Sequence, residues 1–418
     1  MSSRRGPRGA NLGQLGTFNQ AVVLHAIRTN PGVSRVEIGG LTGLAGQTVT
    51  NICRRLLRDG LIVEGEPVAA GQGKPRTPLT IDAGARYAVG VHVDPALTTL
   101  VLLDLVGQTV AAERFATPVS ADARATVAEV GRRATAFLAG TEVPRERVLG
   151  LGVATPGPVD LVRGVVDNPP HLPGWHQVPV RADLERAVGL PVQLEKDVVA
   201  AATAEVWAGT FAGATSAALI YLGTGIGAGL VVDGEVLRGA SNNAGELGQI
   251  VVDQGGERCP CGQRGCTKVI VSAEEMVRRG GSSPGSQAEL DAELRRLYDR
   301  ADAGEERALE VVRSSAVAIV RAALLVTNLL DVERLVLGGP YWGRMSGHVL
   351  AVAPAMFAQH AAAHDIHPVE LLDTPVGEHL AAVGAASLVL DRAYSPRPGS
   401  LVLAPPATGP SAARGQGS

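Results

Sequence analysis

Apolar positions at helical spacing dominate the first part of the chain. From Phe18 they recur with helical periodicity until Asn30, Pro31 and Gly32 interrupt the pattern. A second, short helix is predicted over residues 34–41, because Ser34 followed by Glu37 is the capping-box pattern. A third is predicted over residues 45–59, where an apolar stripe lies opposite a polar and basic one.

A hairpin follows these helices. Residues 61–63 and 78–81 are predicted strands, and residues 69–76 form a Gly-rich loop between them. Three helices followed by a hairpin predict a winged helix-turn-helix, an α+β domain over residues 16–82. Residues 1–15 and 395–418 lack periodicity and are rich in Gly, Ser, Arg, Pro or Ala, so we expect a disordered basic arm and a disordered tail.

Beyond Tyr87 short apolar strands alternate with helices, which predicts an α/β body of two lobes around a cleft. The predicted strands are residues 88–93, 100–105, 148–153, 191–194, 216–222, 229–232 and 334–337, and the predicted helices cover 124–138, a segment after Asp197, and 308–330.

Length and charge agree with this division. The 418 residues exceed what one hydrophobic core supports. The net charge is +5 through Asp82 and −8 over the remainder, which favours a polyanion as the partner of the first part, although compositional scatter is an alternative. No apolar stretch reaches the length of a membrane span, no secretory signal is recognisable, and there are four cysteines. We therefore expect a cytoplasmic, disulfide-free protein with no membrane partner.

Several motifs, in this order and spacing, resemble those of the ROK family (repressors, open reading frames and sugar kinases). They are residues 34–37 (Ser-Arg-Val-Glu), 42–44, 73–76 (Gly-Lys-Pro-Arg), 155–160, 172–175 (Leu-Pro-Gly-Trp), 222–229, 245–248 (Gly-Glu-Leu-Gly), 259–266 and 337–339. The resemblance covers residues 17–392 and implies an actin-like body with two ribonuclease-H-like lobes. Lobe I would comprise residues 83–195 plus about 381–394, and lobe II residues 196–380 with the cysteine cluster.

The helix-turn-helix implies a double-stranded DNA operator as partner. Its second helix enters the major groove, where amide and hydroxyl side chains reach base edges and arginines reach phosphate or guanine. A basic Gly-rich loop suits the narrow minor groove. The candidate contacts are Arg35, Gln47, Thr48, Asn51, Arg54, Arg55, Arg58, Lys74 and Arg76. The alternative is an ordinary solvated helix face. The resemblance implies a homodimer or homotetramer, and two-fold symmetry predicts a palindromic operator.

The phosphate motif of ROK kinases departs from its pattern here. In place of Asp-x-Gly-Gly-Thr the chain has His92, Val93, Asp94, Pro95 and Ala96. Pro95 removes an N–H donor and Asp94 adds a carboxylate near a nucleotide's negative charge. We therefore predict no ATP binding and no kinase activity, with the Gly-rich residues 222–229 serving as a structural turn rather than as a phosphate loop.

The sugar-contact positions of the family are partly kept. Asp197 matches the aspartate that acts as base in the kinases, and Glu246 matches the glutamate of the Gly-Glu segment. Lys196, Gln249 and Lys268 replace an asparagine, a histidine and a glutamate, so two hydrogen-bond acceptors have become cationic donors. One hypothesis is an effector such as a sugar phosphate or sugar acid. The alternative is that the lysines pair internally and close the pocket.

A structural zinc site is predicted from three cysteines. Cys259, Cys261 and Cys266 have C-x-C-x4-C spacing beside glycines. The resemblance places the family's fourth ligand, a histidine, at Gln249, and an amide oxygen is a poor zinc ligand. Free buried thiols are the alternative.

Together these features predict a DNA-binding transcriptional regulator, a repressor of carbohydrate uptake or catabolism, whose degenerate kinase-like body senses a sugar-type effector. Two alternatives remain open: a sugar kinase with an added DNA-binding domain, and a ligand-independent regulator controlled by a protein partner.

Overall fold

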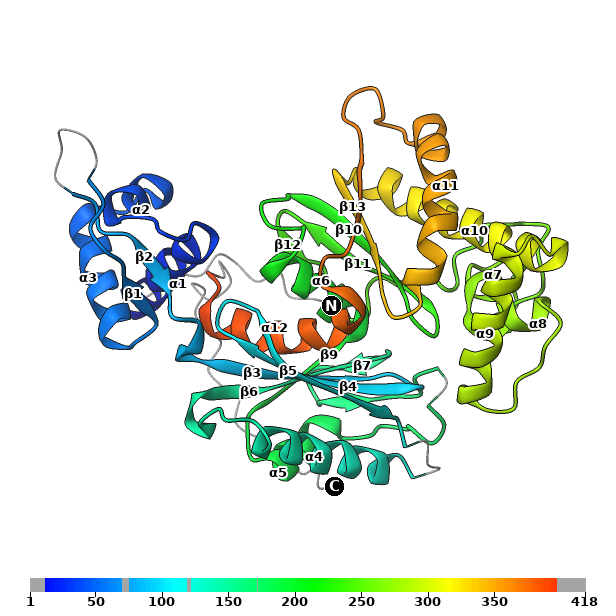
Figure 1. The fold of residues 1–418 in the computed structure, drawn as a ribbon, viewed down its shortest axis with the longest axis horizontal. Helices are drawn as coiled ribbons and strands as arrows, with labels where there is room; N and C mark the ends of the chain where they lie inside the picture. Colours follow the sequence, from blue (N-terminus) through cyan, green and yellow to red (C-terminus); the bar gives the residue numbers. More distant parts are fainter. Residues whose placement is uncertain (1–11, 70–74, 119–121, 171, 397–418) are drawn as a thin grey trace, which may run out of the picture. The chain divides into compact units, whose positions relative to one another are not determined.

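A computed structural model describes residues 12–69, 75–118, 122–170 and 172–396 (Figure 1). The chain divides after Ala85 into two compact units. Of the described residues, those up to Ala85 and those from Arg392 onward form one unit, and those from Arg86 to Asp391 form the body.

The N-terminal unit contains three helices and a hairpin, which confirms the winged helix-turn-helix. The helices are α1 (Leu12–Thr29), α2 (Arg35–Thr42) and α3 (Gly46–Arg58), and β1 (Ile62–Glu64) pairs antiparallel with β2 (Leu79–Ile81). The capping box of Ser34 and Glu37 is present at the start of α2. Because α1 begins at Leu12, residues 12–15 are helical, and their assignment to a disordered arm was wrong.

The core of this unit follows the predicted stripe of α3. Val49, Cys53 and Leu56 are fully buried, as are Ile38 of α2 and Leu79 of β2. Cys53 is therefore a core residue, and burial raises the pKa of its thiol. The opposite side of α3 is left to polar and basic side chains.

The first sheet of the body has the strand order β5-β4-β3-β6-β9. Its strands are β3 (Tyr87–Val93), β4 (Leu97–Asp104), β5 (Thr109–Ala116), β6 (Val148–Thr155) and β9 (Val192–Lys196). The first three strands form an antiparallel meander, β6 pairs in parallel with β3, and β9 pairs in parallel with β6. Helices α4 (Ala123–Ala139) and α5 (Val180–Val188) share a hydrophobic core with one face of this sheet.

The second sheet repeats this topology with the order β12-β11-β10-β13-β14. Its strands are β10 (Ser216–Leu222), β11 (Ile226–Val232), β12 (Glu235–Val236), β13 (Arg334–Gly338) and β14 (Glu370–Asp373). Four helices, α8 (Ala273–Arg279), α9 (Gln287–Asp302), α10 (Glu306–Leu330) and α11 (Trp342–His360), share its hydrophobic core. Two sheets with the same strand order confirm the actin-like, ribonuclease-H-like architecture.

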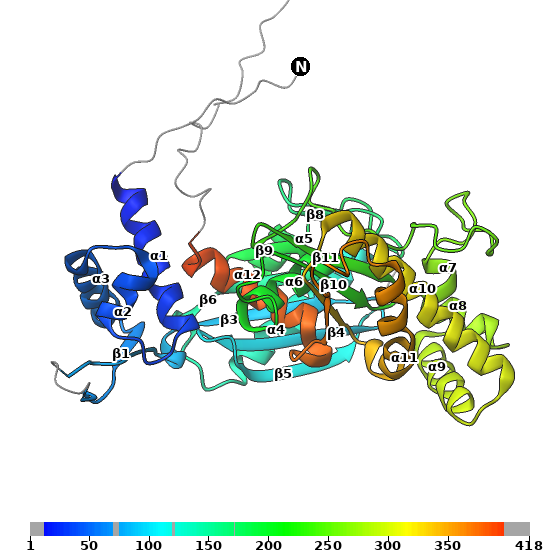
Figure 2. The same ribbon diagram turned by 90° about the horizontal axis from the view of Figure 1, so that it is seen from above.

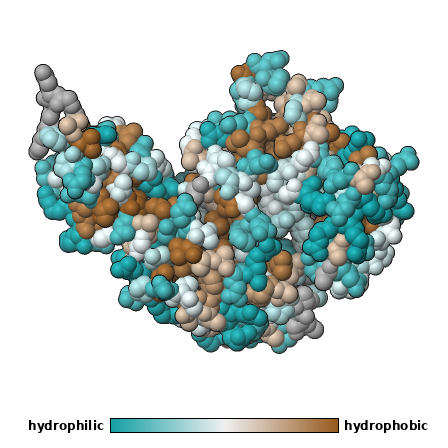
Figure 3. Space-filling view, viewed as in Figure 1, coloured by the Kyte–Doolittle hydropathy of each residue, from teal (hydrophilic) through white to brown (hydrophobic). Residues whose placement is uncertain are grey.

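Shorter elements complete the body. They are the paired strands β7 (Val159–Asp160) and β8 (Val165–Val166), the helix α7 (Lys268–Val271), and the 3-10 turns at Ala83–Ala85, Arg145–Arg147 and Gly377–His379. Figure 3 shows a largely hydrophilic outer surface over the region of α8 and α9. No helix in the described part of the chain is long and apolar enough to cross a bilayer.

Helices α6 (Asp197–Ala208) and α12 (Leu380–Tyr394) lie between the two sheets and pack on both (Figures 1 and 2). Glycines permit their close approach. A Cβ atom on Gly384 of α12 would lie 1.8 Å from the carbonyl oxygen of Ala200 in α6, and one on Gly152 of β6 would lie 1.7 Å from that of Ala385 in α12. A Cβ on Gly229 of β11 would lie 2.5 Å from the carbonyl oxygen of Val198 in α6. Backbone therefore packs directly on backbone from the first sheet through α12 and α6 to the second.

Some boundaries differ from the prediction. Lys196, assigned to lobe II, is the last residue of β9 and pairs with Thr155 in the first sheet. The hairpin partner of β3 begins at Leu97 instead of residue 100, because the turn at Asp94, Pro95 and Ala96 is tight. Helices α5, α9, α11 and α12 were not predicted, since no motif marked them.

The contact between α12 and α6 generates a stability prediction. Gly384→Ala places a methyl group against the carbonyl of Ala200 and is expected to lower the free energy of unfolding by about 3 kcal/mol, as for overpacking of a tight core. Gly347→Ala is the matched control: Gly347 is also inside a helix but a Cβ there meets nothing within 4 Å, so helix propensity should raise stability by up to about 1 kcal/mol. Urea denaturation of both variants measures this, and equal midpoints would contradict the assigned contact.

Candidate functional sites

The exposed side of α3 carries the predicted DNA contacts. Arg54, Arg55, Arg58, Gln47 and Asn51 are exposed, and Thr48 is half-buried. Asn51 Oδ1 accepts hydrogen bonds from Gln47 Nε2 and Arg54 Nη1, both at 3.2 Å. These two hydrogen bonds hold three polar side chains along two turns of α3. The amide N–H groups of Asn51 take no part in them and can donate to an acceptor on DNA.

Two other predicted DNA contacts lie in ion pairs within the N-terminal unit. Arg35 pairs with Glu64 of β1. Arg76 Nη1 donates to Glu37 Oε1 at 2.9 Å, and the other oxygen of Glu37 accepts from the backbone N–H of Ser34 at 2.8 Å. These bonds to Ser34 and Arg76 lower the pKa of the Glu37 carboxyl. Glu37 thus joins the start of α2 to Arg76, in the segment that leads into β2. Lys74 lies outside the described residues.

Three of the five predicted effector-site residues lie together in the body. Lys196 Nζ is 3.3 Å from Glu246 Oε2 and also donates to the carbonyl oxygens of Ala244 at 3.2 Å and Asn243 at 3.4 Å. The Lys196 side chain is 6% exposed, while that of Glu246 is 59% exposed. The ammonium group of Lys196 is therefore engaged by protein atoms, as the internal-pairing alternative expects.

Asp197 begins α6 beside this pair. Its Oδ1 accepts from the backbone N–H of Val198 at 2.7 Å. Burial raises the pKa of Asp197 to about 7, against the lowering influence of Lys196, and the carboxylates of Asp94 and Glu246 add to the increase. A carboxyl group with this pKa can accept or donate a proton near neutral pH.

Gln249 and Lys268 lie on two segments whose backbones are hydrogen-bonded to each other. The backbone N–H of Lys268 donates to the carbonyl of Gly248 at 2.9 Å, and that of Thr267 donates to Ile250 at 2.8 Å. Gln249 is exposed and Lys268 half-buried. Within the described residues, neither side chain has a hydrogen bond to Lys196, Asp197 or Glu246.

The carboxylate of Asp94 accepts hydrogen bonds at the turn after β3. Asp94 Oδ1 accepts from the backbone N–H of Ala96 at 2.9 Å, and Asp94 Oδ2 lies 3.4 Å from Thr224 Oγ1 in the Gly-rich turn of the second sheet. A backbone N–H at such a turn can donate to a phosphate oxygen. Here a carboxylate of the chain itself takes that hydrogen bond.

The three cysteines converge. Their sulfur atoms all lie within 4.8 Å of one another, and Cys261 Sγ is 3.5 Å from Cys266 Sγ. Cys259 and Cys266 are buried and Cys261 is exposed. Three thiolates at this separation suit Zn²⁺, and no further His, Cys, Asp or Glu of the described residues joins the group. The three cysteines thus supply three of the four donors that a tetrahedral zinc site needs.

Two residues that contact the segments of the predicted effector site were not singled out from the sequence. Asn243 donates to and accepts from the backbone of Val159, at 3.0 Å and 2.8 Å, and so fixes the loop that carries the Thr-Pro-Gly-Pro motif. Arg238 Nε pairs with the buried Glu195 at 2.8 Å. Arg238 and Asn243 both precede the Gly-Glu segment at residues 245–246. The pair of asparagines at 242–243 is the sequence feature that could have pointed to Asn243.

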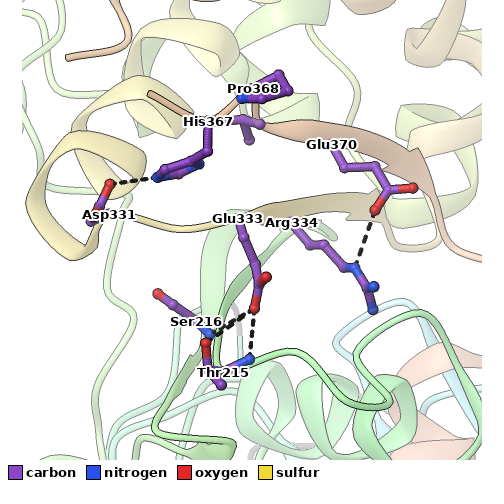
Figure 4. Close-up of a pocket in the computed structure, with 9 residues that line it drawn as sticks. Thr215, Ser216, Asp331, Glu333, Arg334, His367, Pro368 and Glu370 are labelled. Carbon is purple, nitrogen blue, oxygen red and sulfur yellow. Dashed lines mark hydrogen bonds and ion pairs between the residues drawn. The ribbon is translucent and has the colours of Figure 1, made fainter. Parts of the chain in front are cut away.

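A separate surface cavity of about 700 Å³ lies where β10, β13 and β14 begin (Figure 4). Its charged groups bond to one another: His367 Nε2 is 3.0 Å from Asp331 Oδ1, and Arg334 Nε is 3.1 Å from Glu370. Glu333 accepts from the backbone N–H of Thr215 at 2.7 Å. The charged side chains of this cavity are therefore bonded within the protein, and we interpret them as a structural network.

Both units of the chain match known protein families. The model of the ROK family matches residues 88–392, and the model of the MarR family matches residues 17–72. The chain belongs to the ROK family. Within it, this ROK protein is 30% identical over 267 residues to a glucokinase of Halalkalibacterium halodurans, covering 61% of this chain and 80% of that one. It is 25% identical over 336 residues to the DNA-binding transcriptional repressor Mlc of Escherichia coli, covering 79% and 82%.

Solved structures agree on the fold. A ROK family transcriptional regulator described as a homologue of the E. coli MLC protein superposes with a TM-score of 0.73 at 23% identity, over 91% of this chain and 97% of that one. A ROK glucokinase from Streptomyces griseus, in complex with glucose and AMPPNP, superposes with a TM-score of 0.61 at 25% identity, over 72% and 98%. The ROK body is thus joined here to a MarR-type helix-turn-helix.

The cysteine cluster generates a metal prediction. Purified protein should contain about one Zn²⁺ per chain, and it should lose the ion to a chelator faster than the Gln249→His variant, because an imidazole would supply a fourth donor. Gln359→His, at an exposed position of α11 outside the cysteine loop, is the control. Zinc release is followed with a colorimetric chelator. Equal release rates for wild type and Gln249→His would contradict the placement of residue 249 at the metal.

Proposed function

We propose that this ROK protein is a DNA-binding transcriptional regulator of carbohydrate metabolism, a repressor whose body binds a sugar-type effector and does not transfer phosphate. The observation that carries the DNA-binding half is the face of α3, where Gln47, Asn51 and Arg54 form one hydrogen-bonded row beside further arginines. A row of this chemistry fits base edges flanked by phosphates. The repressor assignment is supported by relatives named as the repressor Mlc and as a putative xylose repressor.

Loss of kinase activity is supported by the turn after β3. ATP-dependent transfer needs backbone N–H donors and cations around the phosphates. In this turn Pro95 has no N–H, and the N–H of Ala96 already donates to Asp94. A triphosphate placed here would meet the Asp94 carboxylate instead of free donors. The competing function, a sugar kinase, is favoured by the retained Asp197 and by the resemblance to glucokinases, and it requires ATP turnover.

The sugar side of the body supports a polar ligand. Asp197 and the exposed Glu246 offer carboxylate oxygens to sugar hydroxyl groups. Since the charge of Lys196 is engaged by Glu246, the hypothesis of an anionic sugar depends on Lys268, for which no ion pair occurs within the described residues. We propose a palindromic operator and a homodimer or homotetramer, as two-fold symmetry of paired helix-turn-helix domains requires.

The DNA-binding proposal predicts a matched difference between two arginines. Arg54→Ala should weaken binding to the operator at least tenfold, because it removes both a cation and the hydrogen bond to Asn51. Arg313→Ala removes the same charge from an exposed position of α10 and should change affinity less than twofold. Fluorescence anisotropy with DNA from upstream of the coding region measures both.

Repeating this titration at several salt concentrations shows whether a variant has lost a contact to a DNA phosphate. A variant that makes one fewer bond to a DNA phosphate should show a slope of log affinity against log salt that is shallower by about 0.9. Equal affinities of Arg54→Ala, Arg313→Ala and wild type would remove α3 from the interface.

The effector proposal predicts a role for Lys268. If the effector is anionic, a sugar 6-phosphate should bind more tightly than the neutral sugar, and Lys268→Gln should abolish that preference while Lys268→Arg keeps it. Calorimetry with glucose, N-acetylglucosamine and their 6-phosphates measures the preference. A neutral sugar that binds better than its phosphate would point to Asp197 and Glu246 alone. DNA binding indifferent to every sugar would instead favour control by a protein partner.

A further inference from the structure

A second cavity of the body, with a volume of about 440 Å³, opens at the turn after β3. One side is formed by His92, Asp94 and Leu97 from the first sheet. The other side is formed by Asp291 of α9 and Tyr341 after β13, which belong to the second lobe (Figure 1). A volume of this size accommodates a small organic molecule.

His92 lines this cavity and carries a buried polar atom without a partner among the described residues. The residue is 6% exposed, and its Nε2 has no hydrogen-bond partner in the described structure. Its ring meets Tyr221 edge to face, with 6.4 Å between ring centroids. Burial lowers the pKa of His92 to about 4, so the imidazole is neutral at physiological pH. A buried polar atom without a partner is costly, and a ligand that bonds to it would remove that cost.

Two carboxylates share the cavity with His92. Asp94 is 7% exposed, and Asp291 Oδ1 accepts from the Tyr341 hydroxyl at 2.8 Å. Neither carboxylate has an ion pair with a cation of the described residues. Burial, with a contribution from Asp291, raises the pKa of Asp94 to about 6, so Asp94 is mostly ionised at neutral pH. Buried charge without a counter-ion favours a cationic ligand.

Two of the three arginines of the cavity wall form ion pairs with carboxylates other than Asp94 and Asp291. Arg114 pairs with Glu378 at 2.8 Å. Arg344 pairs with Asp299 at 2.8 Å and Asp302 at 3.0 Å, and it stacks over the ring of Tyr298. Arg295 is exposed. The apolar part of the wall comes from Ala96, Leu97, Leu294 and Pro340.

We propose that this cavity binds a small protonated amine with an apolar or aromatic body. Its ammonium group would donate to Asp94, Asp291 and the Nε2 atom of His92, and its body would contact Leu97, Leu294 and Tyr341. An anionic phosphate is disfavoured because two carboxylates face the same space. The lining of this cavity shares no residue with the proposed sugar pocket.

Binding at this site would bridge the two lobes of the body. His92 and Asp94 come from β3 and the turn after it, whereas Asp291 and Tyr341 belong to the second lobe. Among the described residues, the hydrogen bond that joins the Asp94 side chain to the second lobe is donated by Thr224 Oγ1 to Asp94 Oδ2, at 3.4 Å. A ligand held from both sides stabilises the lobe arrangement in which those groups converge.

The test is calorimetry on the full-length protein with matched pairs of probes: 2-phenylethylamine against 2-phenylethanol, and cyclohexylmethylamine against cyclohexylmethanol. We expect each amine to bind at least tenfold more tightly than its alcohol. Asp94→Asn and Asp291→Asn keep side-chain shape, and each should reduce amine affinity at least tenfold. Glu274→Gln, an exposed position on α8, is the control and should leave affinity unchanged.

Three results with the amine probes would overturn the proposal. They are the absence of binding by both amines at millimolar concentration, equal affinity for amine and alcohol, and amine binding that persists in both aspartate variants although circular dichroism reports a native fold. Preferential binding of AMP over the amines would also overturn it and would assign the cavity to an anionic ligand. Because ligand heat is measured without DNA or sugar, these results are distinguishable from failure of the proposed regulatory function.

Discussion

Backbone contact between α6 and α12 is the constraint on which the body depends. Gly384 lets α12 lie against Ala200 of α6, while Gly152 and Gly229 let the two sheets approach these helices from either side. Any side chain at these glycines would separate elements that now touch. The two lobes therefore meet through a dry, small-residue contact whose geometry has little freedom, and motions between them must pivot about this pair of helices.

The candidate sites lie at the ends of the elements that this contact positions. Asp197 is the first residue of α6, and Lys196 ends the neighbouring strand β9. His92 is near the end of β3, which also packs on α12 through Gly90. A ligand that changes the angle between the sheets therefore acts on the same helices that hold the sites. Under the proposed function, the cleft would be kept and ligand binding would change the angle between the lobes instead of leading to phosphate transfer.

Much of this organisation could be predicted from the sequence. The capping box at Ser34, the apolar stripe of α3 and the C-x-C-x4-C cysteines are local patterns, and each determines a local structure. The internal pairing of Lys196 could not be resolved, because Glu246 is fifty residues away in the chain and only the folded body brings the two together. The cavity beside His92 has the same cause: its walls come from β3, α9 and the segment after β13, whose meeting no local pattern encodes. Asp94 was correctly singled out as a departure from the kinase motif, yet its hydrogen bond to Ala96 is visible only in the structure.

A regulator of the proposed kind couples sugar binding in the body to DNA binding by the helix-turn-helix. Thermodynamic linkage makes such coupling reciprocal, so the most direct measurement is the dissociation constant of the sugar effector determined by calorimetry with and without saturating operator DNA. We predict that the operator weakens sugar binding by the same factor by which the sugar weakens operator binding, a factor of about 5 to 150 for a typical coupling. A sugar dissociation constant that is identical in the presence and absence of the operator would contradict this coupling.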